Sequence, residues 1–265
     1  MFSFLWRKLR LAHLRKRIPA PRISRALSLN LEANLTAVKQ ELGNSPDLVI
    51  RRLTLDYGRG IAAALLFIDG LVDKDVVNKD ILFPLLEKGT LGKWQAAGNI
   101  LEHLSVKVLA VGDVQRETQF GRVVENLLQG DTVLLLDGED EALLLASKGW
   151  EKRAVAEPDT ERIITGPHEG FTENLRTNTA LLRRKIADPG LHFEELKLGR
   201  RTRTAVVIAY LKGIVNEKLV AEVRTRLKRV NIDFVLDANY LTEFISDAPL
   251  SLFPTVAFTE RPDVA

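Results

Sequence analysis

Two stretches of the chain carry apolar residues at the three- and four-residue spacing of a helix face, and each face includes one asparagine. The first lies in 27–42 and the second in 166–186. The two faces consist of Leu27, Leu31, Asn34, Val38 and Leu42, and of Phe171, Leu175, Asn178, Leu182 and Ile186. This spacing predicts two amphipathic helices. In the second stretch acidic residues come first and basic residues last, which suits the helix dipole.

The remaining apolar runs predict strands and further helices. Strands are expected at 48–55, 63–68, 106–111, 132–136, 142–146, 193–198 and 204–211, with two weaker candidates at 150–155 and 233–236. Helices are expected at 76–86, 120–128, 216–230 and 241–245. Two apolar runs around Asp137-Gly138 predict a β-hairpin. The mixture of strands and helices places the fold in the α/β (α+β) class.

The order helix, strand, strand, helix occurs twice, which predicts an internal duplication. The helix faces match at a constant shift of 144 residues, and the strands that follow match at 143. We therefore expect a basic N-terminal arm, 1–25, and two related subdomains, 26–157 and 158–265, each a small mixed sheet flanked by helices. A polar linker that contains Pro158 joins them. The first copy continues into the 137–138 hairpin and the second does not, so we expect a fragment, cut where more sheet should follow.

Asn34 and Asn178 hold the same position in the two copies. A buried amide must form hydrogen bonds to avoid a cost of about 1–3 kcal/mol. We expect a structural role, in which each amide ties a neighbouring loop or strand end, rather than contact with a ligand.

Composition excludes several kinds of chemistry. Hydrophobic residues make up 46% of the chain, charged residues 28%, and cysteine is absent. The chain is therefore an ordinary globular protein without disulfides, thiolate metal sites or cysteine nucleophiles. Its longest uncharged apolar runs, 61–68 and 204–211, are too short to cross a bilayer.

The net charge of +3 comes from the N-terminal arm. Eight basic residues precede the first acid, Glu32, which leaves 30 basic against 35 acidic residues for the whole remainder. Aromatic and leucine residues interleave with these charges, as in a segment that binds a membrane surface or a partner. A frayed basic tail explains the pattern equally well. Nucleic acid is not expected as a partner, because the globular part is acidic.

No catalytic, cofactor or metal site is predicted from the residues. Gly58-x-Gly60-x-x-Ala63 precedes a strand, whereas a dinucleotide-binding motif follows a strand and opens a helix. The four histidines lack metal-ligand spacing, and no nucleophile elbow or Ser/His/Asp pattern occurs. The aspartates at 69, 73, 75 and 80 lack the spacing of a calcium loop, and a polar strand-to-helix loop is the better account.

One long motif resembles a known family. It runs from Trp150-x-x-Arg153 through Pro158 and Glu161 to Gly166-Pro167-x-Glu169-Gly170-Phe171-Thr172-Glu173-x-Leu175-Arg176-x-Asn178 and on to Ile186, and 252–254 and 259–263 look like its later motif. This pattern resembles the GerA family, the A subunits of spore germinant receptors, over about 48–265.

The resemblance implies a soluble N-terminal region in two parts, followed by a membrane-spanning region. It implies assembly with a transporter-like B subunit and a lipoprotein C subunit in the inner spore membrane, with the soluble region on the cytoplasmic (core) side. It also implies a homo-oligomer that conducts ions when germinant is sensed. The family carries no known catalytic residues, so an enzyme is not expected.

Two functions remain open from the sequence. The first is an assembly and signal-transmission module whose interface or hinge uses Gly166, Pro167, Glu169, Gly170, Glu173, Arg183 and Arg184, on a charged face opposite the apolar stripe. These residues would form contacts between subdomains or between subunits. The alternative is a small-molecule domain that binds a germinant or an ion in a cleft between the two repeated halves.

Overall fold

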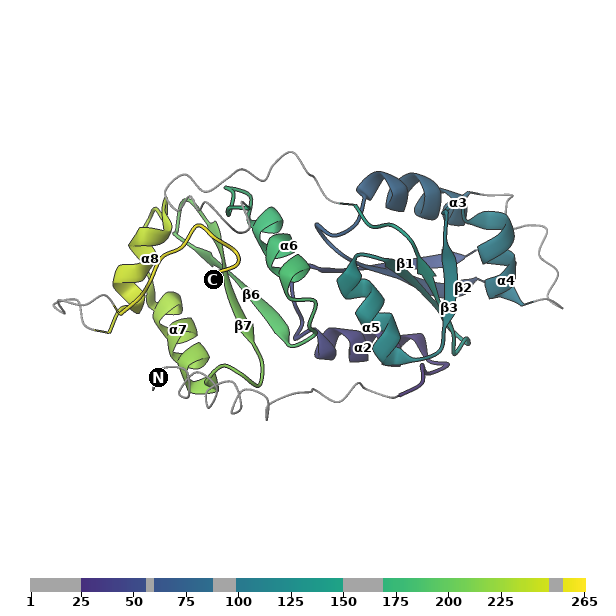
Figure 1. The fold of residues 1–265 in the computed structure, drawn as a ribbon, viewed down its shortest axis with the longest axis horizontal. Coiled ribbons are helices and arrows are strands. Elements are labelled where there is room, and N and C mark those ends of the chain that lie inside the picture. Colours follow the sequence, from purple (N-terminus) through teal and green to yellow (C-terminus); the bar gives the residue numbers. More distant parts are fainter. Residues whose placement is uncertain (1–24, 56–59, 88–98, 150–168, 248–254) are drawn as a thin grey trace, which may run out of the picture.

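The computed structural model describes residues 25–55, 60–87, 99–149, 169–247 and 255–265. Residues 1–24 of the basic arm, the weak strand candidate at 150–155 and the linker lie outside the described residues. We call 25–149 the first half and 169–265 the second half. Figure 1 shows the two halves side by side along the long axis of the molecule.

The first half is built on a five-stranded sheet in the order β1-β2-β4-β5-β3. Neighbouring strands are antiparallel throughout, and β4 and β5 form the hairpin predicted around Asp137-Gly138. Gly138 has φ +87°, the left-handed conformation that such a turn requires. The strands are β1 (Leu48–Leu55), β2 (Ile61–Ile68), β3 (Val114–Glu117), β4 (Thr132–Leu136) and β5 (Ala142–Leu145).

Helices cover both faces of this sheet (Figure 1). The helices α2 (Leu31–Glu41) and α5 (Phe120–Gln129) cover one face, where the alternate residues Ala64 and Leu66 of β2 join their core. Ala63 and Leu65 point to the other face and its separate core. That face carries the π-helical η1 (Val76–Leu82) and η2 (Leu104–Val108) with the short α3 (Phe83–Leu86) and α4 (Ile100–His103).

The second half repeats the beginning of this plan with fewer elements. Its sheet has two antiparallel strands, β6 (Leu191–Leu198) and β7 (Thr204–Leu211). The helices α7 (Glu217–Arg229) and α8 (Ala238–Ile245) pack on one face around Leu227, Val235 and Leu241. The helix α6 (Leu175–Lys185) lies between β7 and the first half, near α5 (Figure 1). The predicted α+β class is confirmed.

Three details differ from the sequence predictions. The apolar run at 106–111 predicts a strand, but 104–108 is π-helical, with Leu104 and Val108 buried one turn apart. Short apolar runs do not separate buried strands from buried helices, which is why this prediction is wrong. No strand forms at 233–236, and every strand pairing in the described sheets is antiparallel, not mixed.

Candidate interface between the two halves

Arg183 of α6 joins the two halves through one fully buried side chain, which is 0% exposed. Its Nε donates to Asp47 Oδ2 at 2.8 Å, and its Nη2 donates to Asp47 Oδ1 at 3.3 Å and to Ser45 Oγ at 3.1 Å. Its Nη1 donates to the Leu191 carbonyl at 2.7 Å, and its guanidinium lies 4.7 Å from the centre of the Phe193 ring. Since Asp47 and Ser45 precede β1, this cluster connects α6 and β6 to the first half.

The geometry of this cluster is that of a strong charge-assisted contact. The planar guanidinium meets both oxygens of Asp47, which is itself 1% exposed. Burying the pair requires that nearly every donor find an acceptor, and the further bonds of Arg183 meet that need. We expected Arg183 on a charged face, and this is wrong. The buried residues Thr179 and Ala180 lie on the same face of α6 as Arg183. Because their side chains are small, this face has room for a guanidinium.

Two glycines of the first half allow the second half to come close. Gly43 has φ +64°, and a Cβ there would lie 2.4 Å from Nδ1 of His192. Gly70 has φ +92°, and a Cβ there would lie 2.8 Å from Cβ of Ala180 in α6. Any larger residue at either position meets both a strained backbone and an occupied space. The halves are therefore closely packed at these two glycines as well as at the Arg183 cluster.

His192 lies in this contact and is 6% exposed. Its ring packs edge-on against Tyr210, with ring centres 5.7 Å apart and planes at 68°. Burial, together with the positive charge of Lys212, lowers the pKa of His192 below its ordinary value. The contact therefore favours a neutral imidazole.

Next to His192 in β6, Glu194 is the centre of a charged network that connects α7 to the two-stranded sheet of β6 and β7. Glu194 accepts hydrogen bonds from Tyr210 Oη at 2.7 Å and from Arg224 Nε and Nη2 at 2.7 and 2.6 Å. The bonds from Arg224 lower the pKa of Glu194, and burial with the bond to Glu194 raises the pKa of Tyr210 to about 12. The carboxylate is thus ionised and the phenol neutral at physiological pH.

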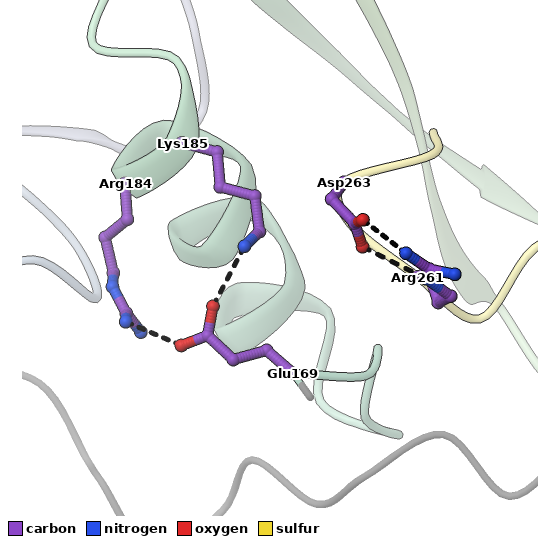
Figure 2. Close-up of polar contacts among 5 residues, drawn as sticks. All are labelled: Glu169, Arg184, Lys185, Arg261 and Asp263. Carbon is purple, nitrogen blue, oxygen red and sulfur yellow. Dashed lines mark hydrogen bonds and ion pairs between the residues drawn. The ribbon is translucent and has the colours of Figure 1, made fainter. Parts of the chain in front are cut away.

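Residues 169–174, which we call the entry segment, precede α6, and their first residue, Glu169, contacts the end of that helix (Figure 2). Its carboxylate accepts from Arg184 Nη2 at 2.7 Å and from Lys185 Nζ at 3.0 Å. Partial burial opposes ionisation of Glu169, but the Lys185 hydrogen bond and the Arg184 charge outweigh it, and its pKa is lowered. These pairs fold the segment before α6 back along the helix.

The late motif 259–263 lies beside the same segment. Arg261 and Asp263 form a two-bond ion pair with N–O distances of 2.5 and 3.2 Å, close to α6 in Figure 2. The backbone NH of Phe171 donates to the Glu260 carbonyl at 2.6 Å. The two parts of the sequence that carry the family resemblance therefore meet in space.

The recurring asparagines satisfy their amides locally and in the same way. Asn34 Nδ2 donates to the Ser28 carbonyl at 2.6 Å, and its Oδ1 accepts from the Ser28 NH at 2.9 Å. Asn178 makes the same two bonds with Thr172, at 2.6 and 2.7 Å. Each side chain pins the residue six positions earlier, before its helix begins. The geometry favours the structural role over a ligand contact.

The other predicted interface residues differ in what they do. Gly166 and Pro167 lie outside the described residues. Gly170 is buried, whereas Glu173 is exposed and has no hydrogen bond or ion pair within the described ranges. The structure thus brings Glu169 and Arg184 together at the surface and places Arg183 separately, in the interior.

A cavity of about 690 Å³ lies between the loop after β2 and α6. Both halves line it, with Asp69, Asp73, Lys74 and Lys148 on one side and Arg176 and Arg184 on the other. Most of these charges are paired: Lys74 with Asp69 at 2.9 Å, and Arg176 with Glu195 at 2.8 Å. Arg176 Nη1 is buried and has no hydrogen-bond partner among the described residues.

The described residues hold no group of three or more His, Cys, Asp or Glu side chains placed to bind a metal ion. In the acidic loop, Asp73 Oδ1 accepts from the NH groups of Asp75 and Val76 at 2.8 and 3.3 Å, which starts the following helix. Asp73 therefore acts as a helix-capping group, whereas Asp69 and Asp75 form ion pairs with Lys74 and Lys79.

The fold and this interface define an α+β domain whose two halves are joined by a buried ion pair. The crystal structure of the N-terminal domain of the A subunit of the Bacillus megaterium spore germinant receptor GerK3 matches it with a TM-score of 0.70. The match is 34% identical and covers 91% of this chain and 88% of that one. The chain corresponds to such an A-subunit N-terminal domain.

The chain belongs to the GerA family, described as Bacillus/Clostridium GerA spore germination protein, which matches residues 36–265. Spore germination protein KA of Bacillus subtilis (strain 168) is 35% identical over 90% of this chain and 43% of that protein. Spore germination protein GerLA of Bacillus cereus is 35% identical over 89% of this chain and 48% of that protein.

The chain thus spans about half the length of these relatives. The predicted family is confirmed, and so is the prediction that the chain is not an enzyme, because the family consists of receptor components. Over the residues that the structure describes, no helix is long and apolar enough to cross a bilayer.

The sequence did not reveal the Asp47–Arg183 pair, whose members lie 136 residues apart. A faint signal exists in α6: Thr179, Ala180 and Arg183 share a helix face, and two small residues beside an arginine fit a buried guanidinium. Nothing in the sequence of the turn at Ser45–Asp47 identifies Asp47 as the acceptor for Arg183.

Proposed function

We propose that this region is the assembly and signal-transmission module of a germinant receptor A subunit. In this proposal it works in the inner spore membrane on the core side, with a transporter-like B subunit, a lipoprotein C subunit and further copies of itself. It couples germinant sensing to the opening of an ion channel. The relatives are named as germination proteins, and a solved relative is a receptor A-subunit domain, which supports this role.

The observation that carries the proposal is the buried contact between the halves. Because the Arg183–Asp47 pair is buried and the chains approach closely at Gly43 and Gly70, we expect the two halves to move together. The surface pair Glu169–Arg184 then ties the entry segment to α6. A displacement imposed on this segment would pass through α6 into the first half without local bending, because close-packed side chains transmit strain.

The test uses the surface pair, since its loss should leave the domain folded. Arg184→Glu places like charges together, and we expect spores that carry it to germinate more slowly in response to nutrient. The charge swap Glu169→Arg with Arg184→Glu should restore the rate. Lys228→Glu is the matched control, because it makes the same kind of charge reversal at an exposed residue of α7 that forms no ion pair within the described ranges. Normal germination of Arg184→Glu spores with wild-type amounts of the subunit would refute the role of the pair.

A second candidate function is small-molecule binding, and the cavity shared by the two halves favours it. Its charges of both signs, including Arg176, suit a small polar ligand such as an amino acid. A thermal-shift screen of amino acids, sugars and ions tests this idea. At a hundredfold excess over Kd, binding adds about 2.7 kcal/mol, and a rise of several degrees should vanish in Arg176→Gln. If no compound raises the Tm, the small-molecule function is refuted and the assembly role remains.

A further inference from the structure

The geometry of the second half follows that of the first up to Glu260. In the first half the NH of Leu27 donates to the Thr118 carbonyl at 2.8 Å, just before α5 begins. In the second half the corresponding bond joins Phe171 and Glu260 at 2.6 Å. The described chain therefore reaches the position that precedes α5 in the first copy.

The two copies differ at one sheet edge. The strand β2 pairs with β1 on one side and with β4 on the other, where residues 63–66 face 133–136. Its counterpart β7 pairs with β6, and among the described residues nothing pairs with its other edge. The positions that would face a strand there are 206–209, at the shift of 143 that relates β2 to β7.

Burial differs at the same positions. Residues 63–66 of β2 are all 0% exposed, whereas 206–208 are half-buried and Ala209 is exposed. The clearest case follows the strand. Leu71 is 2% exposed, and its counterpart Ile214 is 72% exposed. Soluble proteins usually cover an unpaired edge of an apolar strand and an exposed apolar side chain beside it.

The first half shows what covers these positions. Leu71 packs in one core with Leu127 and Leu128 of α5. It also lies against the turn between α5 and β4, where a Cβ on Gly130 would come within 2.7 Å of the Leu71 carbonyl oxygen. Leu71 is thus covered by α5 and the glycine turn, and the next strand, β4, pairs with the edge of β2.

We infer that the open edge of β7 and Ile214 bind a helix followed by an apolar β-hairpin of the same polypeptide, equivalent to 120–145. The family supplies chain for it, because this chain spans 43% of protein KA and its solved relative is an N-terminal domain. The shift of 143 places the counterpart of Thr132 at about position 275, ten residues past Ala265. The hairpin adds its first strand antiparallel to β7 and completes the second sheet.

Cysteine accessibility tests this inference, because the present chain has no cysteine. Ile214→Cys is compared in residues 1–265 and in the full-length subunit, with any other cysteine replaced by serine. Maleimide should label the site at least about tenfold more slowly in the longer protein, since burial limits labelling to local opening. Leu219→Cys is the control: Leu219 is 57% exposed, its counterpart Val76 is not part of the buried core, and its labelling should not change.

Hydrogen exchange of the wild-type proteins gives a second readout that needs no substitution. The amides of 206–209 that do not pair with β6 should exchange more slowly in the longer chain. Equal labelling of Ile214→Cys in the two proteins together with unchanged exchange would overturn the inference. Protection in residues 1–265 alone that rises with protein concentration would overturn it too, by assigning the edge to a second copy.

Discussion

Loss of Arg183 should destabilise the domain far more than loss of its neighbour Arg184. Arg183→Met keeps an unbranched side chain of similar length but removes the guanidinium, and it leaves Asp47 buried at 1% exposure without its cation. Breaking a buried ion pair by removing one partner costs about 3–5 kcal/mol. For a chain of this size, each kcal/mol lowers Tm by about 2–4 °C, so a fall of roughly 6–20 °C is expected.

Arg184→Met is the matched control. Arg184 is 27% exposed in its pair with Glu169, and surface pairs contribute about 0–1 kcal/mol. Urea unfolding of both variants and the wild type, followed by far-UV circular dichroism, gives the free energies of unfolding. Arg183→Lys should recover only part of the loss, because an ammonium cannot meet both Asp47 oxygens and the Leu191 carbonyl in the arginine geometry.

The decisive comparison is a double-mutant cycle. Asp47→Asn with Arg183→Met removes both charges, so the double variant should be more stable than the sum of the single losses predicts. If Arg183→Met costs less than about 1 kcal/mol, or if the losses simply add, the buried pair does not hold the halves together and the reasoning fails.

Three further predictions follow from the same contact. Gly70→Ala should lower Tm more than Gly213→Ala at the equivalent turn, because only the first adds a clash with α6 to the left-handed strain; equal losses would refute the close approach. The free energy of unfolding should fall as pH drops below 6.5, the ordinary pKa of histidine, since the unfolded chain protonates His192 first; urea titrations of His192→Gln should show a shallower fall. Asn34→Ala should cost about 1–3 kcal/mol in chemical unfolding, and Asn178→Ala less, because Asn178 is only half-buried; neutral substitutions would contradict the pinning role.

Much of the fold could be predicted because its signals are local. The helix at 120–128, the strands at 48–55 and 204–211, and the 137–138 hairpin all follow from periodicity and turn chemistry. The edge strand Val114–Glu117 was missed, because a short polar segment shows its nature only by pairing with β5. The strand predicted at 106–111 failed for the related reason that burial on all sides hides the period.

The candidate site also has one part that local sequence signals predict and one part that they do not. The pairing of Glu169 with the basic end of α6 involves residues 15 and 16 positions apart, and the charged motif already suggested contacts there. The role of Arg183 could not be read in this way. Its acceptor lies in the other half of the molecule. From neighbouring residues alone, an arginine in the last turn of a helix is expected to be solvated.

By itself, the sequence determined most of the helix and strand pattern and the family, and it predicted the duplication and the structural use of Asn34 and Asn178, because each depends on residues close along the chain or on repeated spacing. Only the tertiary structure decided that Arg183 is buried against Asp47, that Gly43 and Gly70 admit the second half, and that one edge of β7 is left open in the part described. The physical reason is that burial and ion pairing are properties of surfaces brought together across more than a hundred residues, which no local spacing records.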